Sequence, residues 1–173
     1  IVIKPSNIYI EVPTYTHGIW DVTTFYTREE FRDFVRSVFI DAGPDEGYGL
    51  TVEISKQFNI EARKFQKQGY YCQAPLKSKD FMAYWDEQKS KCRWGVIYKE
   101  GEKTWYVTRD YYMWLNFLPI YDKEEKRFDF AKVRDAQYHM ALYECLGELY
   151  YKHLPILKKR QIASSYFHMA KLI

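Results

Sequence analysis

The sequence predicts an α+β amino-terminal region with a β-hairpin, followed by the first strand, loop and helix of an incomplete α/β unit. Three observations lead to this prediction. First, helices with capping residues alternate with short extended segments. Second, two short alternating runs on either side of a glycine predict one hairpin. Third, a charged cluster at residues 122–127 is followed by a helix, an apolar run of strand length and another helix. We therefore place a domain boundary at that cluster, between residues 1–121 and residues 122–173.

The composition is that of a folded domain. Apolar residues make up 47% and aromatic residues 19% of the 173 residues, which excludes a disordered or low-complexity chain. The aromatic share fits an aromatic-rich core better than a set of base-stacking platforms. A net charge of +3 does not by itself indicate a nucleic-acid partner. The spacing of the three cysteines and four histidines predicts neither a disulfide framework nor a metal site.

The first part of the chain carries extended and helical signals. Alternation over residues 8–12 predicts short extended segments. Thr27 and Glu30 form a capping-box pattern before apolar residues that recur at helical spacing, which predicts a helix ended by Gly43. A second helix is expected to end at Gly69.

The remaining elements follow from caps, turns and periodicity. Ser78 is expected to cap a helix over residues 79–93 that Gly95 ends. The other predicted elements are a hairpin with strands at 96–98 and 105–107, an aromatic core helix at 110–117, a helix at 133–151, a strand at 154–157 and a helix from residue 165.

The segment between the last predicted strand and helix carries residue types that bind phosphate. A helix amino-terminus offers unpaired N–H groups and a favourable dipole, a lysine can reach phosphate oxygens, and a hydroxyl can hold magnesium. Lys158 and Lys159 supply the cation, and Ser164 and Ser165 supply hydroxyls. The usual G-x-x-x-x-G-K-[ST] pattern is absent, because Ala163 replaces the second glycine. On these residues alone, a solvated charge run at a strand end is the alternative.

Three segments together resemble one protein family. Residues 159–165 resemble the deviant phosphate-binding loop of phage terminase large subunits, with an Arg-Gln-aliphatic core and the lysine at the front of the loop. Residues 133–138 resemble the adenine-binding motif of that family. Residues 81–120 resemble the segment before the ATPase in terminases of large tailed and crAss-like phages. Residues 1–80 match no family that we can name.

The resemblance implies a P-loop ATPase that binds ATP and Mg²⁺. It implies that Gln137 contacts adenine, since an amide can pair with the N6 and N7 edge. It also implies that Lys158 or Lys159 reaches the β and γ phosphates, and that Arg160 stabilises charge in the transition state. The other nucleotide-binding positions that it implies are Gln161, Ala163, Ser164 and Ser165, with Ser165 or Ser164 on magnesium.

For the full-length protein, the resemblance implies a viral DNA-packaging motor in the host cytoplasm. Its partners would be double-stranded viral DNA, the portal protein, the small terminase subunit and further copies of itself, with no membrane. We expect the chain to be an inactive fragment of that motor, since it starts at Ile1 and its acidic Walker B strand would follow Ile173. Two alternatives stay open: a non-enzymatic phage α+β binding module, and a superfamily 2 helicase fragment with a Q-motif.

Overall fold

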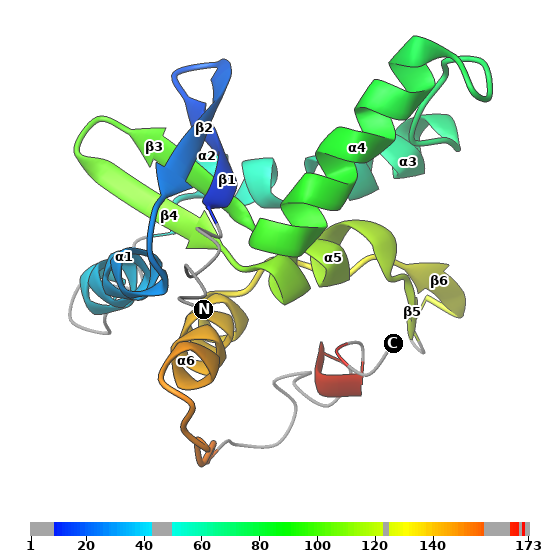
Figure 1. Cartoon of the computed structure of the whole chain (residues 1–173). Coiled ribbons are helices and arrows are strands. Elements are labelled where there is room, and N and C mark those ends of the chain that lie inside the picture. Colours follow the sequence, from blue (N-terminus) through cyan, green and yellow to red (C-terminus); the bar gives the residue numbers. More distant parts are fainter. Residues whose placement is uncertain (1–8, 43–49, 123–124, 158–166, 170, 172–173) are drawn as a thin grey trace, which may run out of the picture.

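The computed structural model describes residues 9–42, 50–122, 125–157, 167–169 and 171. A four-stranded mixed sheet with the order β2-β1-β3-β4 is surrounded by helices, and a separate two-stranded hairpin lies near α5 (Figure 1). The strands are β1 (Ile10–Thr16), β2 (Ile19–Phe25), β3 (Val96–Glu100), β4 (Lys103–Val107), β5 (Ile120–Asp122) and β6 (Arg127–Asp129). The helices are α1 (Arg28–Asp41), α2 (Val52–Phe58), α3 (Ile60–Gln68), α4 (Lys79–Trp94), α5 (Arg109–Phe117) and α6 (Asp135–Leu149).

Two antiparallel hairpins form the sheet, and a parallel pairing of β1 with β3 joins them. The β1–β2 hairpin turns at His17 and Gly18, whose φ angles of 48° and 85° are those of a type I′ turn. The predicted hairpin is confirmed as β3–β4, with Gly101 in its turn at a φ of 60°. In the parallel pairing, Thr14 lies opposite Ile97.

The capping signals lie at the helix starts that they predicted. The Thr27 hydroxyl accepts a hydrogen bond of 3.1 Å from the Glu30 N–H at the start of α1, and the Ser78 hydroxyl accepts one of 3.2 Å from the Phe81 N–H in α4. The Glu30 carboxylate accepts from the N–H of Tyr26 at 2.7 Å, so its half of the capping box reaches one residue before the cap.

The helix ends agree with the glycine signals where the structure describes them. Gly69 ends α3 with a φ of 82°, and Gly95 ends α4 with a φ of 79°. Gly43 lies outside the described residues, and α1 ends at Asp41. Helix α2 was not predicted. Thr51 caps it, since its hydroxyl accepts from the Ile54 N–H at 3.2 Å.

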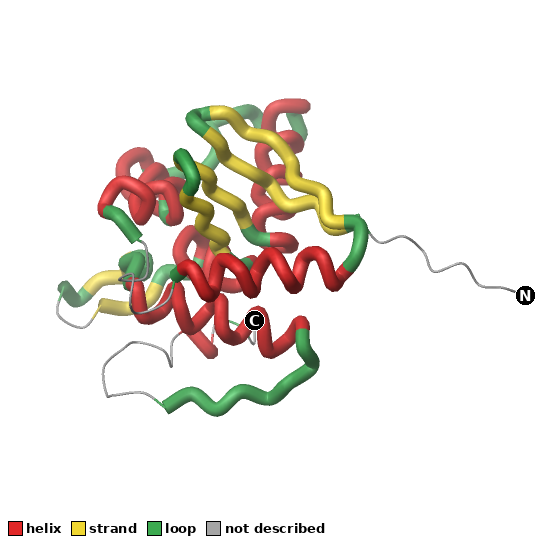
Figure 2. Tube along the Cα trace, turned by 90° about the vertical axis from the view of Figure 1, so that its left-hand side faces the viewer, coloured by secondary structure: helices red, strands yellow, loops and turns green. Residues whose placement is uncertain are grey.

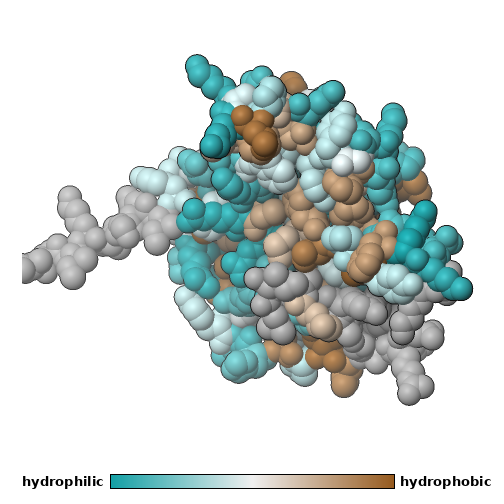
Figure 3. Space-filling view, turned by 90° about the vertical axis from the view of Figure 1, so that its right-hand side faces the viewer, coloured by the Kyte–Doolittle hydropathy of each residue, from teal (hydrophilic) through white to brown (hydrophobic). Residues whose placement is uncertain are grey.

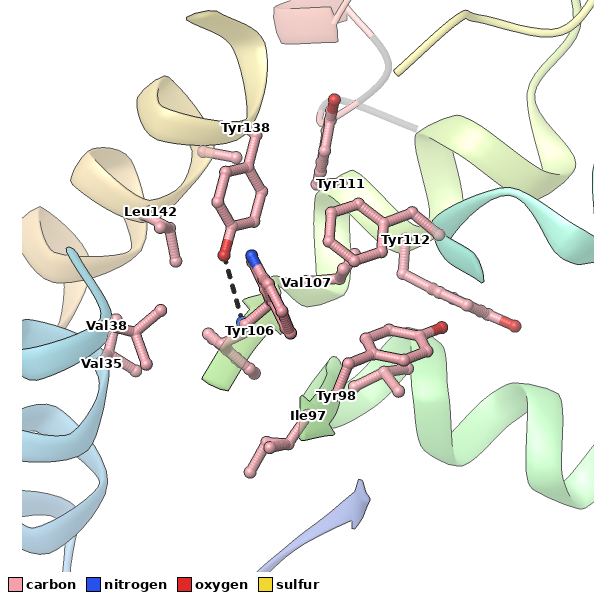
Figure 4. Close-up of a cluster of buried hydrophobic side chains, with 14 of the residues drawn as sticks. Val35, Val38, Ile97, Tyr98, Tyr106, Val107, Tyr111, Tyr112, Tyr138 and Leu142 are labelled. Carbon is pink, nitrogen blue, oxygen red and sulfur yellow. Dashed lines mark hydrogen bonds between the residues drawn. The ribbon is translucent and has the colours of Figure 1, made fainter. Parts of the chain in front are cut away.

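Buried tyrosines fill both faces of the sheet (Figure 4). Tyr106 pairs across the strands with Ile97, so the next residue, Tyr98, points to the opposite face. The Tyr106 ring lies 5.7 Å from the ring of Phe31 in α1, whereas the Tyr98 ring lies 5.3 Å from that of Phe58 in α2. The core is therefore rich in aromatic residues, although other aromatic side chains, such as Trp20 and Phe128, are exposed.

Helix α6 belongs to the same core. It packs beside α1 (Figure 1), and its inward residues Tyr138, Leu142 and Leu146 lie in the buried cluster that also contains the sheet residues. In the described part of the chain, one core thus extends across the predicted boundary at residues 121 and 122.

The predicted strand over residues 154–157 is wrong. Figure 2 shows a loop after α6, and Leu157 is 99% exposed. Pro155 lacks an N–H for a strand ladder, and this segment pairs with neither sheet. The apolar residues of this segment do not form a strand. Leu154, for example, packs against Gly147 of α6.

The surface mixes polar and apolar side chains, as Figure 3 shows for the face on the side of α4 and the β5–β6 hairpin. Leu76 and Phe128 are 81% and 71% exposed. Within the described ranges, no helix combines the length and the apolar character that crossing a membrane requires.

Replacing Tyr138 by phenylalanine is expected to destabilise the fold by about 1–3 kcal/mol. The Tyr138 hydroxyl accepts a hydrogen bond of 3.2 Å from the backbone N–H of Tyr106, and both residues are buried (Figure 4). The variant would leave that N–H without its acceptor. Urea unfolding measures the effect. Tyr121→Phe is the control, since Tyr121 is 48% exposed, and equal losses in the two variants would contradict the expectation.

Candidate functional site

A cavity of about 360 Å³ lies between α5, the β5–β6 hairpin and the start of α6. Gln137, the predicted adenine contact, lies on its wall and is 2% exposed. Trp114 and Ala131, 2% and 6% exposed, together with the half-buried Phe130, form apolar parts of the lining. We call this cavity the Gln137 cavity.

Tyr111 holds the start of α6 against α5 and so positions Gln137 in the first turn. The Tyr111 hydroxyl donates to the carbonyl of Arg134 and accepts from the N–H of the same residue, both at 3.4 Å. Burial raises the pKa of Tyr111, so the phenol stays neutral and keeps its proton for this contact. The backbone of Gln137 is therefore fixed by a contact with the neighbouring helix.

Trp114 contributes a hydrogen-bond donor as well as an apolar ring. Its indole Nε1 is buried, and it has no acceptor among the residues that the structure describes. A buried donor without a partner costs about 1–3 kcal/mol, and because this N–H is enclosed by protein, a ligand in the cavity would meet the Trp114 ring and not the N–H.

Charged side chains surround the opening of the cavity. Lys132 and Arg134 are exposed and make no ion pair with a carboxylate in the described part of the chain. Asp129 is occupied differently: it accepts the Phe130 N–H at 2.8 Å and an N–H of the Gln66 amide, and it lies 3.5 Å from Arg127. Asp122 and Glu125 also line the cavity, so the lining has three carboxylates and three cations and no net charge. Attraction of a phosphate group therefore depends on the positions of Lys132 and Arg134 and not on a net positive charge.

Phe167, two residues after the predicted phosphate loop, packs against Trp114 of the cavity lining. Phe167 is 1% exposed, and its ring lies 6.2 Å from the ring of Trp114 and 5.9 Å from that of Tyr111. Residues 167–169 are helical, where a helix was predicted. The loop residues themselves lie outside the described residues: Lys158, Lys159, Arg160, Gln161, Ala163, Ser164 and Ser165.

The sequence indicated only one member of this site. Gln137 was singled out by resemblance, whereas Trp114 was predicted to be a core residue, and it is buried. Nothing in the sequence singled out Lys132 and Arg134, since isolated charges near a predicted loop are usually solvated. No group of three or more metal-ligating side chains occurs within the described ranges, and the predicted magnesium residue, Ser165, is outside them.

A larger cavity of about 470 Å³ lies between α1 and the β3–β4 hairpin, but none of the predicted site residues lines it.

Comparison with known proteins yields no match to any family model, curated protein or solved structure. The function of the Gln137 cavity must therefore be argued from its own residues.

Proposed function

We propose that the Gln137 cavity binds the adenine ring of ATP, and that the chain is an amino-terminal fragment of a viral DNA-packaging terminase large subunit. One observation carries the nucleotide-binding proposal. Phe167, two residues after the last residue of the predicted phosphate loop, packs against Trp114, which lines the same cavity as Gln137. This contact supports the proposal that the two segments hold the two ends of ATP.

The chemistry of the cavity suits a nucleotide. An amide both donates and accepts, so Gln137 can pair with the N6 and N7 edge of adenine. The indole ring of Trp114 offers an apolar surface to the planar base. Lys132 and Arg134, which are exposed, would lie near the attached phosphates, while Asp122 and Glu125 of the same lining would oppose them.

The loop residues complete the proposal. Lys158 or Lys159 would reach the β and γ phosphates, Arg160 would stabilise transition-state charge, and Ser164 or Ser165 would hold Mg²⁺. In the full-length protein, ATP hydrolysis would drive double-stranded DNA through the portal in the host cytoplasm, together with the small subunit and further copies of the large subunit. The fragment alone is proposed to bind ATP without hydrolysing it.

Gln137→Ala is expected to weaken ATP binding roughly tenfold or more, because a bidentate amide–adenine pair contributes about 1–3 kcal/mol. Titration of the fragment with a fluorescent ATP analogue measures this. Gln88→Ala is the matched control: Gln88 is also 2% exposed and its amide oxygen accepts from the Tyr112 hydroxyl at 2.7 Å, but it does not line the cavity. Circular dichroism checks that both variants fold.

The outcomes separate the proposal from the alternatives. A binding module would give no ATP binding by the unmodified fragment, and equal losses in Gln137→Ala and Gln88→Ala would also count against the adenine assignment. A helicase fragment could bind ATP through Gln137 as well. It is distinguished by the gene beyond residue 173, where a terminase should continue to an aliphatic strand ending in Asp-Glu and then to a carboxylate-rich nuclease.

A further inference from the structure

Another cavity, of about 230 Å³, is lined by three arginines from three helices. Arg28 is the first residue of α1, Arg109 is the first residue of α5, and Arg93 lies in the last turn of α4. Glu148, near the end of α6, supplies the single carboxylate of the lining. We call this cavity the arginine pocket. It shares no lining residue with the Gln137 cavity.

Two of the three guanidinium groups are held in place by the same residue. Arg28 Nη2 donates to the backbone carbonyl of Glu148 at 3.2 Å, and Arg109 Nη2 lies 3.0 Å from the Glu148 carboxylate. The Arg28 guanidinium also lies over the ring of Tyr151, 4.4 Å from its centroid. Side chains that are ordered before binding lose less conformational entropy when a ligand arrives.

The arginines are only partly neutralised. Among the described residues, neither Arg28 nor Arg93 pairs with a carboxylate, and the guanidinium of Arg93 lies 5.1 Å from the ring centroid of Trp94. Arg109 is the exception, since it lies near Asp110 as well as Glu148.

The lining therefore carries a positive balance. Three guanidinium groups and one carboxylate leave two net positive charges on it. Burial raises the pKa of Cys145, which also lines the pocket, to about 12, so its thiol is neutral and repels no anion. Lys171 lies 3.2 Å from Glu148 and 3.4 Å from Asp110, so both nearby carboxylates are shared with another cation.

We propose that the arginine pocket binds a phosphomonoester attached to a planar ring, as in a mononucleotide or at the 5′ end of a nucleic-acid strand. A phosphomonoester carries about −1.5 to −2 charges at neutral pH, which matches the balance of the lining. Guanidinium groups bind phosphate oxygens through paired hydrogen bonds. Trp94, which is partly exposed, supplies aromatic surface for the ring. A cavity of this volume holds one terminal group rather than a length of strand backbone.

The test compares two fluorescent octathymidylates, one with a 5′ phosphate and one with a 5′ hydroxyl, by anisotropy on the whole 173-residue chain. The phosphorylated strand is expected to bind roughly tenfold more tightly, since two or more charge-assisted hydrogen bonds depend on its phosphate. Displacement of the phosphorylated strand by thymidine 5′-monophosphate would show that a free mononucleotide enters the same pocket, and failure to displace it would restrict the pocket to strand ends. If the two strands bind equally, the proposal is wrong.

Arg93→Ala is expected to reduce binding of the preferred phosphorylated probe roughly tenfold. Arg36→Ala is the matched control, because Arg36 is an exposed arginine of α1 that does not line the pocket. Glu148→Gln should tighten binding, since it removes the carboxylate that competes for Arg109. Equal effects of Arg93→Ala and Arg36→Ala would overturn the proposal. Gln137→Ala should leave this binding unchanged, so a failure of either site is distinguishable from a failure of the other.

Discussion

Gly95→Ala is expected to lower the free energy of unfolding by about 3 kcal/mol or more. Gly95 joins α4 to β3 with a φ of 79° and a ψ of −166°, a region that is essentially restricted to glycine. A Cβ there would lie 2.7 Å from Cε2 and 2.8 Å from the hydroxyl of Tyr106, and closer still to the Val107 carbonyl. Tyr106 cannot retreat easily, because it is 2% exposed and its hydroxyl donates to the Trp94 carbonyl at 2.7 Å. Urea unfolding followed by circular dichroism measures the loss.

Gly69→Ala is a control at a second glycine with a positive φ. Gly69 has a φ of 82° and a ψ of 4°, in the left-handed helical region that other residues can adopt at a smaller cost, and a Cβ there would have no neighbouring atom within 4 Å. The variant should cost only about 1 kcal/mol, which is the price of the backbone conformation. If the two variants lose equal stability, the contact with Tyr106 and Val107 is not the cause of the effect.

Asn116→Ala is expected to cost about 3–5 kcal/mol. Asn116 is completely buried in α5, and its amide oxygen accepts the backbone N–H groups of Glu61 and Ala62 at 3.1 and 3.3 Å. Its amide nitrogen donates to the carbonyls of Phe58 and Tyr112 at 2.8 and 3.0 Å. One side chain thus caps α3 from another helix and also bonds to the end of α2. Alanine would leave several buried backbone groups without partners, and thermal or urea unfolding would record the loss.

Asn59→Ala is the control for the Asn116 variant. Asn59 occupies the N-cap position of α3, where asparagine normally accepts an N–H of the first turn. Here its side chain makes no capping bond, and its Oδ1 is buried without a partner among the described residues. Removing it should cost less than about 1 kcal/mol. A larger loss at position 59 than at position 116 would contradict the assignment of the cap to Asn116.

The elements predicted correctly are those with a local physical signal. Thr27, Ser78 and Gly95 act on backbone groups within a few residues, so their effect can be read from the sequence alone. Helix α2 has only seven residues and stops at Asn59, which leaves too few turns for a periodic pattern. The strand predicted at residues 154–157 had apolar residues but no partner strand, and partners are set by tertiary structure.

The candidate sites depend on segments that are distant in sequence, which limited their prediction. Gln137 and Trp114 lie on different helices, and only the folded chain brings them to one cavity. The arginine pocket is a clearer case, since Arg28, Arg93 and Arg109 each look like ordinary surface charges in their own segments. The parallel pairing that joins the two hairpins could not be predicted either, because nothing in the local sequence of β1 or β3 specifies its register.

The parallel pairing of β1 with β3 also constrains the order of folding. Thr14 cannot meet Ile97 until the segment that contains α1 to α4 has been synthesised, so the loop that closes on this contact is long. The β1–β2 hairpin can form as soon as it leaves the ribosome, but the edge of β1 that will pair with β3 stays open until then. Assembly of the sheet is therefore a late event, and a nascent chain that stalls before β3 would present that edge to other proteins.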